Sequence, residues 1–223
     1  MRTLWGLPLL VTRTLWGLSL LVALLGAAPA AGLPVLSEVF YDAVGTDDGL
    51  GFVEIYGEAG TDLDGLTVEG INGSDGGVTV SLALSGSIPA DGLFVLADQT
   101  SGGGSSVPGA DQLLNFDFQN GPDSVLLREG DVVLDALGYG VFDGGEVFAG
   151  EGNSAPDPPA GSSLARRFAD IDSGDNAADF LVLEVPTPGS ASLSGIPEPS
   201  SALLLSVGLL GLARIGGRAS TPA

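Results

Sequence analysis

Short apolar runs, separated by clusters of glycine, aspartate and proline, dominate residues 34–186. Every second residue from Val78 to Leu84 is apolar, and the residues between them are threonine, serine and alanine. This two-residue period is typical of a half-buried strand. Two further apolar runs flank Glu129-Gly130, a pair that predicts a tight hairpin. No long segment keeps the 3.6-residue period of an amphipathic helix.

The apolar runs predict nine short strands joined by frequent turns. They cover residues 35–41, 52–56, 63–68, 78–85, 93–97, 124–128, 131–137, 164–168 and 180–185. Many short strands with turn signals between them favour an all-β fold, an antiparallel β-sandwich. Residues 142–162 are rich in glycine, proline and acids. They are expected to form a long surface loop, which is either functional or merely variable.

The charge balance is strongly acidic. The 223 residues include 28 acids and seven arginines, for a formal charge of −21. Four arginines lie in the terminal segments, so the stretch from Ala31 to Pro197 has 27 acids against three arginines, or −24. Such a surface repels phosphate backbones and anionic lipid headgroups, because binding to either depends on cationic side chains. We therefore expect no nucleic-acid partner, and membrane contact only through the terminal segments.

Three residue types that carry much of enzyme chemistry are missing, since the sequence has no histidine, no cysteine and no lysine. This excludes a Ser-His-Asp relay, a cysteine nucleophile, a lysine Schiff base, disulfides and thiolate metal sites. Carboxylate chemistry and metals bound through oxygen remain.

Residues 1–30 have the pattern of a secretory signal peptide. Arg13 supplies a positive charge, residues 15–26 form an apolar stretch, and Ala28 and Ala30 are small residues at positions −3 and −1 of a cleavage site. The mature domain would then begin at residue 31. The alternative is a transmembrane anchor, which needs roughly 20 apolar residues, more than this run has.

The signal region also contains a near-perfect duplication. Residues 2–11 recur as residues 13–22 with one difference in ten. One copy is superfluous for export. This leads to the hypothesis that translation starts at Val11 and that residues 1–10 lie upstream of the true start.

The C-terminal segment has a different ordered pattern. Pro197, Glu198 and Pro199 are followed by a short apolar run and by Arg214 and Arg218. This order resembles the PEP-CTERM sorting signal of Gram-negative bacteria, although its two spaced arginines are fewer than the family's usual basic cluster. The alternatives are an ordinary C-terminal anchor and a GPI-type tail.

The PEP-CTERM resemblance, assigned to residues 194–223, implies a sorting route. A short transmembrane helix would anchor the protein transiently in the inner membrane, with its arginines on the cytoplasmic side. A membrane-embedded exosortase would then cleave near the proline triplet and deliver the protein outward. The implied destination is the cell surface or the extracellular matrix.

Residues 31–193 resemble the lamin tail domain family in five blocks that follow one another in the family's order. The blocks are 35–42 with 52–56, 88–97, 121–127 with 133–140, 163–167 with 175–180, and 186–189. The resemblance implies an immunoglobulin-like sandwich, in agreement with the strand pattern. Bacterial members of the family look like accessory adhesion modules of extracellular proteins.

Four carboxylates fall within ten residues, at Asp170, Asp172, Asp175 and Asp179. Alternating acids on a loop that contains glycine can wrap a calcium ion with several oxygens. The spacing departs from an EF-hand loop, because Gly174 occupies the place of the fifth-position ligand. The alternative is that Asp175 and Asp179 cap turns and shield the last strand. The same stretch contains the Asp-Ser-Gly triplet of aspartic proteases, which need two such aspartates.

Glu38 and Glu54 are expected on neighbouring strands. A pair of carboxylates at suitable separation can hydrolyse a glycosidic bond. The alternative is that each binds the backbone or an arginine, such as Arg166 or Arg167. Asn72 opens a formal N-glycosylation triplet, which we interpret as a turn.

The sequence favours an exported, surface-sorted, non-enzymatic binding or scaffold protein of the extracellular or exopolysaccharide matrix. No cofactor is expected, with calcium as the open alternative. The partners expected are the exosortase and extracellular polysaccharide or other surface proteins. The alternatives are a calcium-dependent adhesion module and a carboxylate-based hydrolase of extracellular glycans.

Overall fold

The computed structural model of the chain describes residues 32–194. These residues form ten strands and one short helix. In chain order they are β1 (Val35–Phe40), β2 (Phe52–Tyr56), β3 (Leu66–Asn72), β4 (Val78–Ala83), β5 (Leu93–Asp98), β6 (Gln112–Leu114), β7 (Asp123–Glu129), β8 (Val132–Tyr139), β9 (Ser163–Arg166), α1 (Asn176–Asp179) and β10 (Phe180–Leu183).

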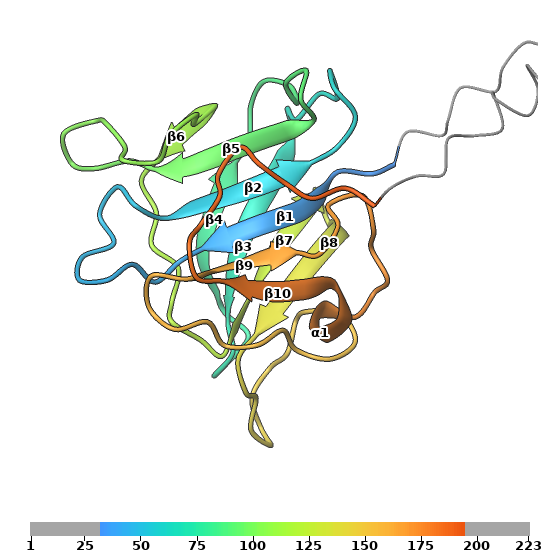
Figure 1. Ribbon diagram of the computed structural model, residues 1–223. Coiled ribbons are helices and arrows are strands. Elements are labelled where there is room, and N and C mark those ends of the chain that lie inside the picture. Colours follow the sequence, from blue (N-terminus) through green and yellow to red (C-terminus); the bar gives the residue numbers. More distant parts are fainter. Residues whose placement is uncertain (1–31, 195–223) are drawn as a thin grey trace, which may run out of the picture. The chain divides into compact units, whose positions relative to one another are not determined.

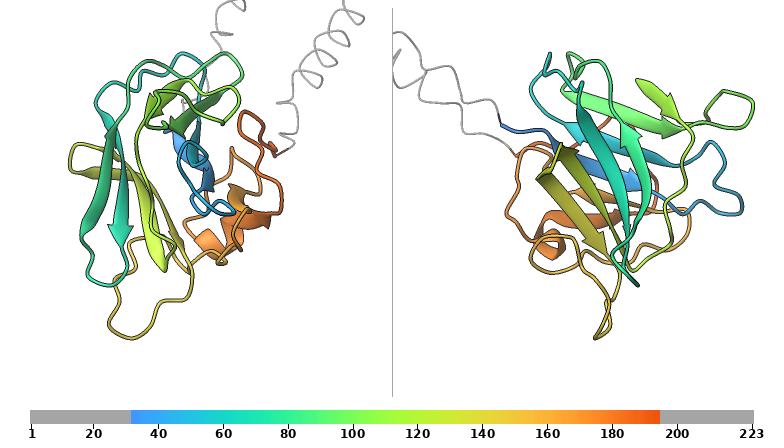
Figure 2. Two further views of the ribbon diagram at one scale, coloured as in Figure 1. Left: turned by 90° about the vertical axis from the view of Figure 1, so that its left-hand side faces the viewer. Right: turned by 180° about the vertical axis from the view of Figure 1, so that it is seen from behind.

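The strands form two stacked sheets (Figures 1 and 2). The six-stranded sheet has the order β10-β9-β1-β2-β5-β6, and the four-stranded sheet has the order β4-β3-β7-β8. The predicted all-β sandwich of two sheets is therefore confirmed. The expectation of wholly antiparallel pairing is wrong at one edge, because β6 pairs with β5 in parallel. The long loop 99–111 allows this, since it carries the chain back before β6 begins.

The hairpin of β7 and β8 forms as its turn residues predict. Gly130 has a φ of +57°, a left-handed conformation that glycine adopts at little cost. β3 begins at Leu66, three residues later than the apolar run suggests. Leu63 lies instead in the turn before β3, where its carbonyl accepts a hydrogen bond from the Leu66 N–H at 3.0 Å. Leu63 is nevertheless fully buried, so an apolar residue of the core was mistaken for the start of a strand.

The main core lies between the two sheets. Leu36, Val53 and Leu96 contribute from the six-stranded sheet, and Val68 and Leu127 from the four-stranded sheet. Each is fully buried. Burying one such side chain stabilises the fold by roughly 1.5–3 kcal/mol. The sandwich is thus held together mainly by this interior layer.

Part of the outer face of each sheet is also covered. On the six-stranded sheet, Phe40, Phe52 and Val95 form a second apolar cluster beneath residues of the 99–111 loop. On the four-stranded sheet, Ile71, Leu126 and Ala136 lie beneath Ala149 of the loop that follows β8. Burial on both faces explains why β5 is a continuous apolar run instead of an alternating one.

The loop expected at residues 142–162 is confirmed, since it contains no named strand or helix. In Figure 1 its first part projects from the lower end of the sandwich. Between residues 32 and 194 there is no helix long and apolar enough to cross a membrane. The predicted signal peptide with Ala28 and Ala30, and the predicted sorting signal with its transmembrane helix, lie outside the described residues.

Candidate functional site

Glu38 and Glu54 lie opposite each other on β1 and β2. They are 1% and 0% exposed. Glu38 accepts hydrogen bonds from the Ser163 hydroxyl at 2.5 Å and from the Thr187 N–H at 2.8 Å. Glu54 accepts bonds from the Ser37 hydroxyl and, at 2.6 Å, from the Gly189 N–H. We call these two acids, with the closing segment 184–194 that they hold, the carboxylate clamp.

The closing segment of the clamp covers the two glutamates. In Figure 1 the closing segment runs across the face of β1 and β2, so it covers both carboxylates. Burial raises the pKa of Glu54, while the Ser37 hydroxyl and the Gly189 N–H oppose that rise. Of the two partners left open by the sequence, the structure shows the backbone, because Arg166 bonds to other acids. Both carboxylates are therefore buried and bound to donors of the protein itself.

Arg166, on β9, is the charged centre of the sandwich and is 4% exposed. Its guanidinium donates to Asp135 Oδ2 at 2.7 Å, to Asp179 Oδ2 at 3.0 Å and to Asp172 Oδ1 at 3.4 Å. The guanidinium carbon also lies 4.6 Å from the centre of the Phe180 ring, a cation–π contact. We call Arg166 and these three aspartates the arginine centre.

Asp135 ties the two sheets together, because it lies on β8 while Arg166 lies on β9. Its Oδ2 also accepts the Leu36 N–H of β1 at 2.6 Å. Burial raises the pKa of Asp135, and the guanidinium and this N–H oppose the rise. Sequence reasoning missed this residue. The available signal was one acid inside the otherwise apolar run of β8, which only a buried partner makes tolerable.

The four predicted calcium ligands each bind donors of the protein itself. Asp172 and Asp179 belong to the arginine centre. Asp175 caps α1 by accepting the Ala177 N–H, and Asp170 accepts the N–H and the hydroxyl of Ser194. The structure therefore does not bring these four carboxylates to one point. Asp175 caps α1, as the alternative expected, whereas Asp179 accepts hydrogen bonds from Arg166 and Ser173.

A different set of acids does converge. Oxygens of Asp135, Glu151 and Asp172 lie within 4.8 Å of one another, and within residues 32–194 no other three acids form such a group. Glu151 Oε2 is buried and has no hydrogen-bond partner. Burial, and then the charges of Asp135 and Asp172, raise the pKa of Glu151 to about 7. Glu151 therefore holds a proton readily, and the three acids together are a candidate site for binding a cation.

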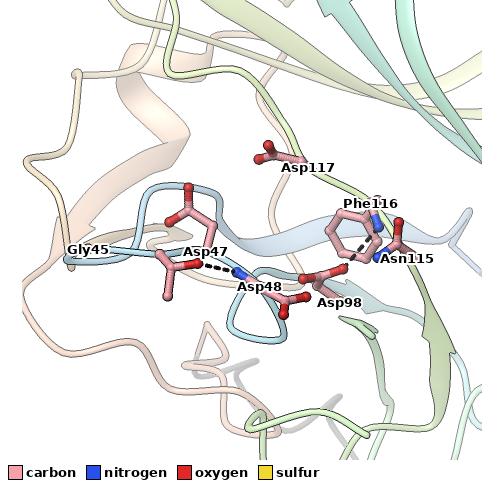
Figure 3. Close-up of a pocket in the computed structure, with 8 residues that line it drawn as sticks. Gly45, Asp47, Asp48, Asp98, Asn115, Phe116 and Asp117 are labelled. Atoms are coloured by element: carbon pink, nitrogen blue, oxygen red, sulfur yellow. Dashed lines mark hydrogen bonds between the residues drawn. The ribbon is translucent and has the colours of Figure 1, made fainter. Parts of the chain in front are cut away.

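Two pockets open elsewhere on the surface. The acidic pocket has a volume of about 480 Å³ and is drawn in Figure 3. It is lined by Gly45, Thr46, Asp47, Asp48, Asp98, Asn115, Phe116 and Asp117. Asp98 accepts the N–H groups of Gly49 and Phe116, so it braces the pocket. Burial, together with Asp47 and Asp98, raises the pKa of Asp117. The pocket therefore repels anions.

The second pocket, here the amide pocket, has a volume of about 420 Å³. It is lined by Asn72, Ser74, Gln119, Asn120, Gly121, Pro122, Asp123 and Glu146. The triplet that begins at Asn72 forms a turn, as interpreted from the sequence, and the side chain of Asn72 accepts the Ser74 N–H at 2.7 Å.

Comparison with known proteins assigns this chain to no family. The chain matches no family model, no curated protein and no solved structure. The function must therefore be argued from the residues themselves.

Proposed function

We propose that this chain is an exported, non-enzymatic binding or scaffold protein of the extracellular or exopolysaccharide matrix of a Gram-negative bacterium. One observation carries the proposal. Glu38, Glu54, Asp135 and Arg166 are all buried, and each joins segments that are far apart in the sequence. These buried acids and the buried base thus stabilise the sandwich, and polar pockets remain open to a partner.

Two resemblances support the finer identity. The five lamin-tail blocks occur in order along a domain whose strands stack in two sheets, which supports an immunoglobulin-like sandwich of that type. The Pro197-Glu198-Pro199 triplet, the apolar run and the two arginines support sorting by an exosortase, with release at the cell surface or into the matrix. The matrix role follows from this sorting signal by association.

The test follows the protein through a bacterium that has an exosortase. The full chain and a Pro197→Ala/Pro199→Ala variant are expressed, and immunoblotting measures each in the inner membrane, the matrix and the medium. We expect the natural chain in the matrix fraction and the variant in the inner membrane. Deleting the exosortase should have the same effect as the variant.

A matched control uses a second triplet of the same kind. Pro156, Asp157 and Pro158 repeat the proline–acid–proline pattern in the loop before β9. A Pro156→Ala/Pro158→Ala variant should still reach the matrix. The proposal fails if the natural chain stays in the inner membrane or is shed wholly into the medium.

A calcium-dependent adhesion module is the second candidate, favoured by the orphaned Oε2 of Glu151 beside Asp135 and Asp172. An ion there would satisfy this oxygen and would stabilise the folded chain by ligand linkage. Millimolar calcium should then raise the melting temperature reversibly, and Glu151→Gln should abolish the rise. An unchanged melting temperature would dismiss this candidate. A glycan hydrolase at Glu38 and Glu54 gains no support, because the closing segment covers the pair.

A further inference from the structure

The amide pocket is built where three segments meet at one end of the sandwich. They are the turn after β3, residues 119–122 with Asp123 at the start of β7, and the loop after β8. The turn and the loop lie together at the lower end in Figure 1, and both views of Figure 2 agree. The loop is the one that its length marks as either functional or variable.

Short hydrogen bonds, each with a backbone group as donor or acceptor, fix the three segments to one another. The Gly73 N–H donates to Asp123 Oδ1 at 2.6 Å, and the Val147 N–H donates to the Gly73 carbonyl at 2.6 Å. The Tyr139 hydroxyl holds the Gln119 carbonyl at 2.9 Å. A Cβ on Gly73 would lie 2.0 Å from the Pro122 carbonyl oxygen, so the approach requires glycine. The pocket is thus formed before any ligand arrives, which lowers the entropy cost of binding.

The groups left to a ligand are mostly neutral amides. The Oδ1 of Asn72 is occupied by the Ser74 N–H, which leaves its NH₂ group to donate. The side chains of Gln119, Asn120 and Ser74 are exposed at the pocket. Primary amides donate and accept side by side, and two neighbouring hydroxyl groups of a sugar ring present the matching acceptor and donor.

The two acids of the pocket decide the charge of its ligand. Asp123 and Glu146 each accept a backbone N–H, from Gly73 at 2.6 Å and from Asp143 at 2.5 Å. Both acids belong to the stretch 31–197, whose formal charge is −24. An anionic ligand is therefore repelled, whereas a neutral hydroxyl can still donate to the free lone pairs of these carboxylates.

We propose that the amide pocket binds a short, uncharged, hydroxyl-rich segment of a polysaccharide. The inference rests on the proposed matrix function for its biological setting, and it names the class of partner. The volume of about 420 Å³ lies within the roughly 300–1,000 Å³ typical of small-ligand sites. A peptide is a poorer fit, because Pro122 is the one lining residue that would offer an apolar contact to a side chain.

The test titrates the purified full chain with neutral tetrasaccharides of glucose, galactose or mannose, in a detergent without a sugar headgroup. Side-chain amide signals in ¹H–¹⁵N spectra report the site. We expect one of the three to shift the signals of Asn72, Gln119 and Asn120. A Gln119→Ala/Asn120→Ala variant should bind about tenfold or more weakly, since each lost amide removes hydrogen bonds to the ligand. The Gln119 carbonyl that Tyr139 holds is kept in this variant.

The matched control removes the same two residue types elsewhere, in a Gln99→Ala/Asn115→Ala variant beside the acidic pocket. It should bind as the natural chain does, and equal melting temperatures would show that both variants fold. The inference is overturned if no tetrasaccharide shifts these signals, if both double variants bind alike, or if a polyuronate or a pool of neutral peptides binds as well. Such a failure leaves the matrix proposal standing, because that proposal is tested by cell fractionation.

Discussion

Two groups of buried carboxylates hold the last part of the sandwich, and they use different donors. The carboxylate clamp lies on the outer face of the six-stranded sheet and binds hydroxyl and backbone N–H groups. The arginine centre lies between β8, β9 and α1, and one guanidinium serves three aspartates. The clamp therefore spreads its stability over several weak donors, whereas the arginine centre depends on a single side chain.

The largest expected effect comes from removing that side chain. Arg166→Met keeps much of the volume but leaves Asp135 and Asp179 buried without their cation. Breaking a buried ion pair in this way costs about 3–5 kcal/mol. Urea unfolding of the full chain, followed by circular dichroism, should show this loss.

The neighbouring arginine is the control. Arg167 is exposed and donates to the Ala178 carbonyl at 2.8 Å. Arg167→Met should therefore cost no more than about 1 kcal/mol. Adding Asp135→Asn to Arg166→Met should recover part of the stability, because it removes the orphaned charge. If the two arginine variants unfold at the same urea concentration, the contrast with the clamp is lost.

The clamp should respond more mildly and more locally. Glu54→Gln replaces an acceptor by an amide whose NH₂ can face the Gly189 N–H, so two donors meet. We expect a loss of about 1–3 kcal/mol and faster hydrogen exchange at residues 184–194. Glu38→Gln should act in the same way through Thr187.

The matched control for the clamp is Glu184→Gln, an exposed acid in the closing segment itself. It should leave hydrogen exchange unchanged. Exchange that speeds up across both sheets in Glu54→Gln would show that the clamp is as central as Arg166, which contradicts the comparison.

The strands were predictable because their signal is local. The two-residue alternation of β4 and the Glu129-Gly130 turn each appear within a few residues of the sequence. β6 and α1 were missed because three and four residues are too few for a period to show. Both depend on contacts from distant segments, such as the pairing of β6 with β5.

The chemistry at the centre was predictable only in part. Glu38 and Glu54 were correctly placed on neighbouring strands, because both lie in strong apolar runs. The partner of Arg166 was not predictable from local pattern, since 27 acids compete and Asp135 lies 31 residues away. Burial selects the partner, and burial follows from the packing of the two sheets.

The smallest expected effect depends on pH and concerns Glu151, the acid that the arginine centre leaves without a partner. Its pKa is about 7 in the folded chain, above the value of 4.5 expected when unfolded. The folded state thus holds this proton more tightly. The resulting stability is fully present below about pH 4.5 and is lost as the pH rises through 7. Glu151→Gln should therefore match the natural chain at pH 5 and exceed it at pH 8. The gain should be about 1–2 kcal/mol, because partial exposure screens the charge.

Glu129→Gln, an exposed acid at the end of β7, gives the control, since it should show no pH-dependent gain. The comparison becomes sharper if calcium is added at pH 8. A cation bound by Asp135, Glu151 and Asp172 would do for the natural chain what the proton does at pH 5, so the advantage of Glu151→Gln should shrink. An advantage that persists in calcium would mean that the site takes protons alone. An advantage that is equal at pH 5 and pH 8 would mean that Glu151 is not the uncompensated charge of the arginine centre.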